Sequence, residues 1–166
     1  MATQRFSQSH GIVPVEQCIL GNWASGGAMD SVNMAKYNHA TLIIIGGADC
    51  TTDTTLTVKA ATTDAGTTAN VTFSYRYSAG DIGAASADVL GAVATSSSLT
   101  VTAASLADRM LVVEWDAEDM NVSNVQYQYA TPTLGTDGTD GEYSAVVILS
   151  EPRYEETVMH TAVPTA

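Results

Sequence analysis

The stretch TLIIIGG at residues 41–47 decides the fold class of this chain. Its apolar part is short and rich in β-branched side chains, and two glycines end it, which is typical of a central strand buried on both faces. The stretch TLTVKA at residues 55–60 alternates instead, so its apolar and polar side chains take opposite faces of a sheet. A chain that combines both patterns is expected to build sheets around an apolar core.

More short strands follow along the chain, and no segment has the pattern of a ten-residue amphipathic helix. The other strands are predicted at residues 71–77, 88–90, 99–101, 109–115, 125–129 and 143–149, with one helical turn at residues 103–108. Strands joined without helices do not cross over to parallel neighbours, so antiparallel sheets are expected. The predicted fold is all-β, an antiparallel β-sandwich or a jelly-roll-like barrel, with an extended N-terminal arm.

The length of 166 residues suits one domain with a single core. The composition divides the chain into an N-terminal arm and link at 1–35, a β-sandwich domain at 36–150 and a C-terminal tail at 151–166. Pro14 fixes its own backbone and disfavours helix at Val13, so this segment is predicted to be an arm or an edge strand. Such a segment buries little by itself, and we expect it to lie against the domain or a neighbouring subunit.

Eighteen Asp and Glu residues against six Lys and Arg residues give a formal net charge of −12. Nucleic-acid binding depends on cations that neutralise phosphates, and anionic lipid attracts basic segments, so no nucleic acid and no membrane is expected as a partner. An acidic surface suits a basic patch on a partner protein. The first ten residues are polar and lack the apolar region of a secretory signal, so synthesis in the cytoplasm is expected.

None of the three histidines, His10, His39 and His160, lies in a recognisable catalytic motif. The sequence has no Gly-x-Ser-x-Gly, no phosphate-binding loop and no dinucleotide-binding fingerprint. We therefore predict a protein that is not an enzyme and has no cofactor, with the histidines as surface or capping residues.

Three acidic turns are candidate calcium sites, because Ca²⁺ binds clustered carboxylate and carbonyl oxygens. They hold Asp137, Asp140 and Glu142; Asp49 and Asp53; and Asp116, Glu118 and Asp119. Their spacing does not match an EF-hand, and Asp and Gly form tight turns by themselves, so solvated turns are favoured and no metal ligand is assigned. Cys18 and Cys50 are predicted to be reduced thiols, with a disulfide between them as the open alternative.

The predicted strands also carry an aromatic set, which consists of Tyr75, Tyr77, Trp115, Tyr127 and Tyr129. Aromatic rings stack on the apolar faces of sugars, which makes a carbohydrate-binding surface one hypothesis. Cross-strand aromatic pairs in the core or in an interface explain the same residues without a ligand, and this interpretation is favoured.

Several segments between residues 12 and 154 occur in a recognisable order. They are IVPV at 12–15, Trp23, MAKY at 34–37, the apolar strand at 40–48, LTVKAAT at 56–62, DAGT at 64–67, EDMN at 118–121 and SEPRY at 150–154. This order resembles a family of small virion proteins of tailed bacteriophages, which are encoded close to the major capsid protein. The resemblance implies a structural protein of the phage head, a decoration (cement) protein on the capsid exterior.

The resemblance also implies partners, namely the major capsid protein and further copies of the chain, with a trimer favoured. Contacts to the capsid or to subunits are expected from Gly11, Ile12, Val13, Pro14 and Val15, and from Pro152, Arg153 and Tyr154. Deletion of residues 1–17 is then expected to weaken that binding and to leave the fold intact. Tail-tube, head–tail joining and fibre proteins remain alternatives, as does a carbohydrate-binding module.

Overall fold

The computed structural model describes residues 10–16, 26–48, 50–136 and 141–153. Its strands are β1 (Gly11–Glu16), β2 (Gly27–Ala28), β3 (Val32–Asn33), β4 (Tyr37–Gly46), β5 (Thr54–Ala61), β6 (Ala69–Asn70), β7 (Phe73–Tyr77), β8 (Ala94–Ser96), β9 (Leu99–Val101), β10 (Met110–Asp116), β11 (Asn121–Val122), β12 (Val125–Gln126), β13 (Tyr129–Leu134) and β14 (Tyr143–Pro152). The short helices are η1 (Met34–Lys36), η2 (Ala85–Asp88) and α2 (Ala103–Leu106). No helix in this described part of the chain has the length and apolar character needed to cross a membrane.

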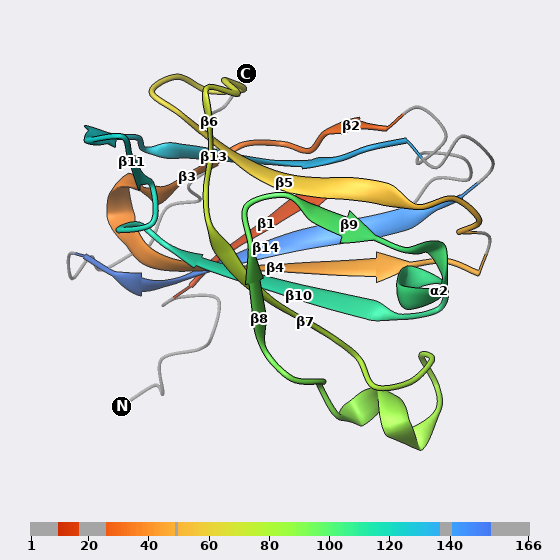
Figure 1. Cartoon of the computed structure of the whole chain (residues 1–166). Helices are drawn as coiled ribbons and strands as arrows, with labels where there is room; N and C mark the ends of the chain where they lie inside the picture. Colours follow the sequence, from red (N-terminus) through yellow and green to blue (C-terminus); the bar gives the residue numbers. More distant parts are fainter. Residues whose placement is uncertain (1–9, 17–25, 49, 137–140, 154–166) are drawn as a thin grey trace, which may run out of the picture.

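Two antiparallel sheets form the two layers visible in Figure 1. Sheet A has the strand order β1-β14-β4-β10-β7-β8. Sheet B has the order β2-β13-β5-β6, with β3 also paired to β13 and β9 also paired to β5. The small hairpin β11-β12 stands apart from both sheets. The all-β sandwich predicted from the sequence is therefore confirmed, and neither sheet closes into a barrel over the described residues.

The core lies between the two sheets. Strand β4 occupies the middle of sheet A, and its inward side chains Leu42 and Ile44 are completely buried. Leu56 and Val58 of β5 are buried in the same cluster from sheet B. Helix α2 covers one end of β4, where a Cβ atom on Gly46 would overlap the carbonyl oxygen of Leu106. Glycine is needed at this position because the helix backbone approaches the strand so closely.

The N-terminal segment is built into the sandwich as the edge strand β1, which pairs with β14. Val13 and Val15 are buried in the core, while Pro14 takes an edge position, where its missing N–H interrupts no essential ladder bond. The following strands β2 and β3 join sheet B, and β14 extends past residue 150 to Pro152. Strand pairing thus continues on both sides of the 36–150 segment.

Three predicted strands differ from the structure. The strand expected at 88–90 is absent, because Asp88 ends the short helix η2 and only Leu90 forms an isolated bridge, to Ser78. The segment expected at 125–129 is divided between β12 and β13, because Ser123 and Asn124 have φ angles of 54° and 63° and form a tight hairpin turn. The segment expected at 71–77 begins only at Phe73, because the chain leaves β6 of sheet B and enters β7 of sheet A. The predicted helical turn at 103–108 is present as α2.

Candidate interaction face

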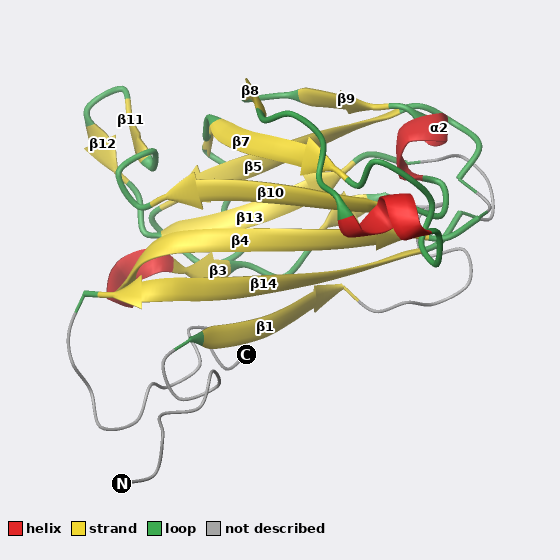
Figure 2. Ribbon diagram, turned by 90° about the horizontal axis from the view of Figure 1, so that it is seen from below, coloured by secondary structure: helices red, strands yellow, loops and turns green. Residues whose placement is uncertain are grey.

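The outer face of sheet A, turned away from sheet B, carries a continuous group of aliphatic side chains. Strand register places Pro14 beside Val146, Val146 beside Ile43, and Ile43 beside Val112. With their neighbours on the same face they form the apolar band, defined as Ile12, Pro14, Ile43, Ile45, Met110, Val112, Val146 and Ile148. Figure 2 views the molecule from the side of sheet A, where β1, β14, β4 and β10 lie next to one another.

This band departs from the two-sided burial expected for residues 41–45. Leu42 and Ile44 are completely buried, but Ile43 is only half-buried and Ile45 is 43% exposed. Ile12 at the edge is 42% exposed. The physical reason is that sheet B packs against one face of sheet A, whereas the outward side chains of β1, β4 and β14 stay partly open to solvent. Val112 of β10 is the exception in the band, at 8% exposed. Contiguous apolar surface is common at protein interaction sites, which makes the outer face of sheet A the candidate interaction face.

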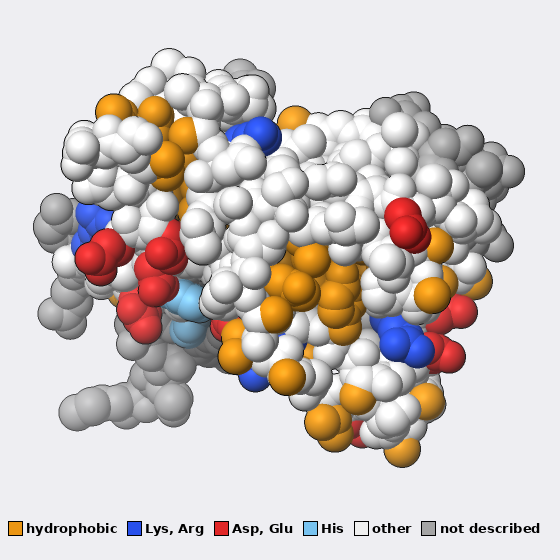
Figure 3. Space-filling view, viewed as in Figure 1, with side chains coloured by type: hydrophobic (Ala, Val, Ile, Leu, Met, Phe, Trp, Pro, Cys, Tyr) orange, Lys and Arg blue, Asp and Glu red, His pale blue; other side chains and the backbone are white. Residues whose placement is uncertain are grey.

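A long loop at residues 79–93, called the projecting loop, borders one end of the band. The peptide N–H of Ile82 donates to the carbonyl oxygen of Asp108 at 2.6 Å, and the Arg109 side chain donates to Asp81 at 3.0 Å. These bonds hold the loop next to Met110. Its Ile82, Val89 and Val93 are 52%, 60% and 62% exposed. Hydrophobic side chains gather on the corresponding lobe in Figure 3, at the lower right.

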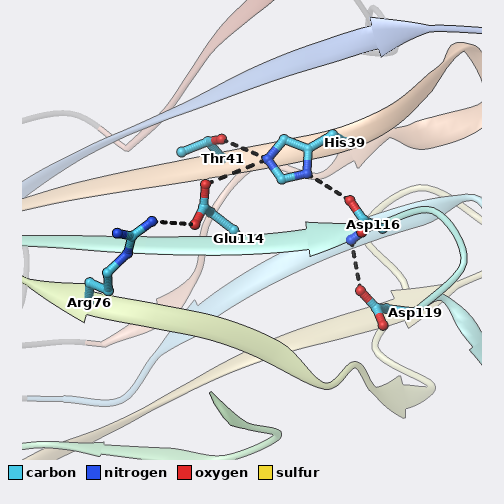
Figure 4. Close-up of polar contacts among 6 residues, drawn as sticks. All are labelled: His39, Thr41, Arg76, Glu114, Asp116 and Asp119. Atoms are coloured by element: carbon cyan, nitrogen blue, oxygen red, sulfur yellow. Dashed lines mark hydrogen bonds and ion pairs between the residues drawn. The ribbon is translucent and has the colours of Figure 1, made fainter. Parts of the chain in front are cut away.

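Polar side chains occupy the other end of the same face, in a cluster called the polar corner, shown in Figure 4. It consists of His39, Thr41, Arg76, Glu114 and Asp116. His39 Nδ1 lies 2.7 Å from Asp116 Oδ1, and His39 Nε2 lies 3.2 Å from Thr41 Oγ1. Glu114 lies 3.7 Å from the imidazole and 3.5 Å from the Arg76 guanidinium. The corner therefore pairs most of its charges internally.

The order Asp116, His39, Thr41 resembles the carboxylate, imidazole and hydroxyl of a hydrolase triad. Such a triad also needs N–H groups directed at the oxygen of the reacting carbonyl. Thr41 lies in the middle of a central strand, and β14 and β10 pair with that strand on its two sides. The backbone groups around Thr41 are therefore committed to sheet ladders, and the flat face forms no oxyanion hole there.

An open recess of about 750 Å³ adjoins the polar corner. It is lined by Asn38, His39, Asp116, Ala117, Glu118, Gln126, Glu151 and Arg153. Its lining holds three carboxylates and one permanent cation, so its charge favours a basic group of a partner. The described residues contain no cluster of His, Cys, Asp and Glu side chains able to hold a metal ion.

The predicted contact residues divide between the core and this face. Ile12 and Pro14 belong to the apolar band, whereas the alternate residues Gly11, Val13 and Val15 are buried. Pro152 ends β14 opposite Tyr37, and Arg153 borders the recess. Tyr154 lies outside the described residues. The structure thus brings part of the first segment onto the exposed face, and it places Arg153 at the recess.

Most of the band was missed by sequence reasoning. Ile43, Val112, Val146 and Ile148 come from three strands that are distant in the chain, and only the strand register brings them together. A signal was present, since residues 42–45 and 145–149 are apolar at nearly every position. Strands of this composition are typical of sheets covered on both faces.

The acidic turns have structural partners in the described residues. Asp119 accepts a hydrogen bond from the Asp116 N–H at 2.9 Å, and Asp53 accepts one from the Ala103 N–H at 3.0 Å at the start of α2. Asp49, Asp137 and Asp140 lie outside the described residues. Cys50 is buried, with its thiol 3.2 Å from the Gly47 carbonyl oxygen. A pairing with Cys18 also lies outside the described residues.

The aromatic set lies mainly in or against the core. Phe73, Tyr75 and Tyr77 follow one another on the inner face of β7, with edge-to-face ring contacts at centroid distances of 6.4 and 6.0 Å. Burial raises the pKa of Tyr77. Trp115 is buried, and Tyr127 packs partly against the core. These contacts favour the packing interpretation over a carbohydrate platform.

Comparisons with protein-family models, with curated proteins and with solved structures found no match to this chain.

Proposed function

We propose that this chain is a non-enzymatic structural protein of a phage virion, a decoration (cement) protein that binds the exterior of the head. The observation that carries this proposal is the outer face of sheet A, where the apolar band lies between the acidic recess and the projecting loop. Aliphatic side chains across four strands contribute little to catalysis, but they contribute much to adhesion when another protein covers them.

The surroundings of the band support a protein partner. Interfaces combine an apolar centre with a polar rim, and here the polar corner and the recess adjoin the band. The recess presents Asp116, Glu118 and Glu151, and the whole chain carries a net charge of −12. A capsid surface with exposed Lys or Arg side chains would complement it. The resemblance noted in the sequence supplies the specific partner, the major capsid protein.

Co-sedimentation with purified phage heads tests this proposal. We expect the protein to pellet with heads, to saturate, and to reach a fixed ratio to the major capsid protein. Glu118→Lys and Glu151→Lys reverse charges in the recess, and they are expected to weaken binding. Glu142→Lys changes the net charge equally outside the recess, and it is the matched control. Absence of pelleting with heads would overturn the decoration role, and self-assembly into rings or tubes would move the protein to the phage tail.

A further inference from the structure

The apolar band has a chemistry that distinguishes it from the recess, because it contains no charged side chain. The outward positions of β4 and β14 within it are Ile43, Ile45, Val146 and Ile148. Charged side chains border the band at both ends and are paired, because Arg76 lies 3.5 Å from Glu114 and Arg109 donates to Asp81 at 3.0 Å. A basic partner surface has nothing to pair with on the band itself. The band instead matches an equally uncharged apolar surface.

We infer that the apolar band is covered by the same band of a second copy of this chain, with two sheets A packed face to face. This inference rests on the proposed function, in that it treats the outer face of sheet A as an assembly surface. It assigns the band to contact between copies, and it leaves the recess and the projecting loop for the capsid.

The sequence of the strands supports this assignment. Residues 42–45 of β4 and 145–149 of β14 have the composition of strands covered on both faces. The described chain covers them on one face only, since Leu42, Ile44 and Val147 are completely buried, whereas Ile43 and Val146 are half-buried. A second sheet about 10 Å away would bury the remaining half, as in other aligned sheet packings.

The size of the face is sufficient for a stable pair. The contact would include the whole outer face of sheet A, that is, the apolar band as its centre and polar side chains as its rim. The five strands β1, β14, β4, β10 and β7, at about 4.8 Å spacing and about seven residues of length, give a face of roughly 24 by 24 Å. Two copies would together bury roughly 1,200 Å², which reaches the lower end of stable protein–protein interfaces. Charge opposes pairing because each copy is acidic, but the band itself carries no carboxylate, so the copies meet where their repulsion is smallest.

The edges of sheet A are less suited to association than its face. Pro14 in the middle of β1 has no N–H to donate to an added strand, and β8 at the opposite edge has only three residues. Proline and very short strands are features that prevent edge-to-edge pairing. Association through the band therefore uses side chains, and it generates a two-fold symmetric dimer.

Sedimentation velocity of the full chain at about 1 to 100 µM tests the inference, with Val146→Lys as the main variant. We expect the wild-type chain to be a dimer and Val146→Lys to raise its dissociation constant at least about 30-fold, as for a central interface residue. Lysine lowers the net negative charge, so weaker association cannot come from general repulsion. Val125→Lys is the matched control, because Val125 is 42% exposed on the separate β11-β12 hairpin. It is expected to leave the dimer unchanged.

A second variant separates interface loss from misfolding. Val146→Thr keeps the shape and strand preference of valine, and circular dichroism and thermal unfolding of both variants report the fold. A monomeric wild-type chain, a trimer, or an association that Val146→Lys does not weaken would overturn the inference. Head binding measured on the same samples is an independent result. A dimer that does not bind phage heads would overturn the capsid role alone. A monomer that binds heads would overturn the pairing of copies alone.

Discussion

Two threonines of β13 occupy opposite chemical settings although both hydroxyls are buried. Ala65 donates its N–H to Ser31 Oγ, Ser31 and Thr131 hydroxyls lie 2.8 Å apart, and Thr131 donates to the Gly66 carbonyl oxygen. This chain of bonds fixes the turn at residues 63–66 on sheet B. The hydroxyl of Thr133 is buried and has no hydrogen-bond partner among the described residues.

We expect Thr131→Val to lower the free energy of unfolding by about 1 to 3 kcal/mol, because the buried Ser31 hydroxyl loses the Thr131 hydroxyl as its partner and the Gly66 carbonyl loses its hydrogen bond from Thr131. Thr133→Val is the matched control in the same strand, and it should be neutral or stabilising by up to about 1 kcal/mol, since it removes an unsatisfied hydroxyl. Urea unfolding of the two variants measures the difference. Equal losses in both would show that the Thr131 chain of hydrogen bonds contributes nothing to stability.

Ionisation of the Tyr143 phenol makes the free energy of unfolding depend on pH in the alkaline range. Burial and the Glu16 carboxylate, 3.4 Å from the phenol oxygen, raise the pKa of Tyr143 well above its usual range. Because the pKa of Tyr143 is higher in the folded than in the unfolded state, its contribution to stability is fully present below the unfolded pKa of about 10. Above that pH the phenol of the unfolded chain loses its proton first, and this contribution is lost as pH rises toward the folded pKa. We expect the free energy of unfolding to fall above about pH 10, by up to about 1.4 kcal/mol per pH unit from this group. Tyr143→Phe should show a shallower fall, and the same slope in both proteins would contradict the assignment.

At the scale of elements, β1 belongs to the core and not to a detached arm. Val13 is completely buried, Val15 is 4% exposed, and the strand pairs with β14 along its length. The expectation that deletion of residues 1–17 leaves the fold intact therefore needs correction. We expect this deletion to lower the free energy of unfolding by at least about 3 kcal/mol, from two buried valines at about 1.5 to 3 kcal/mol each.

Deletion of residues 1–9 is the control, because it removes none of β1. Thermal unfolding of both truncated chains should show a large drop for the longer deletion only. Equal midpoints for the wild-type chain and the 1–17 deletion would show that β1 is dispensable. Binding contributions from this strand are better tested with Ile12→Thr, since Ile12 faces outward.

The elements that sequence predicts well are those that local pattern specifies. The stretch at 41–45 is correctly a central strand, and the helical turn after residue 103 is present. The hairpin at Ser123 and Asn124 was missed because neither residue type predicts a positive φ angle as strongly as glycine does. The switch from sheet B to sheet A before Phe73 depends on long-range pairing, which a local pattern does not contain.

The candidate face was only partly predictable for the same reason. Alternation within β1 identifies Ile12 and Pro14 as residues on one face, but their neighbour Val146 is more than one hundred residues away. Composition predicted burial on both faces for residues 41–45, and this was wrong for the outward side chains Ile43 and Ile45. It could not say that the chain supplies cover for only one, because that depends on how the two sheets stack.

At the scale of the whole molecule, charge and apolar surface act in opposite directions. Each copy carries a net charge of −12, and the uncharged band is where two copies can approach most closely. Repulsion between the copies acts over about one Debye length, which falls from about 30 Å at 0.01 M salt to about 10 Å at 0.1 M. Added salt therefore removes repulsion and leaves the apolar contact in place.

We expect self-association to tighten by roughly tenfold as sodium chloride rises from about 0.02 M to about 0.5 M, because screening reduces the repulsion between acidic chains. Binding to heads through the acidic recess should weaken over the same range, because screening also reduces attraction to basic groups. Sedimentation velocity and co-sedimentation across one salt series measure the two trends. Burial of an uncharged band does not weaken as salt is added. Self-association that weakens with salt would therefore mean that ionic pairs of the polar corner hold the copies together.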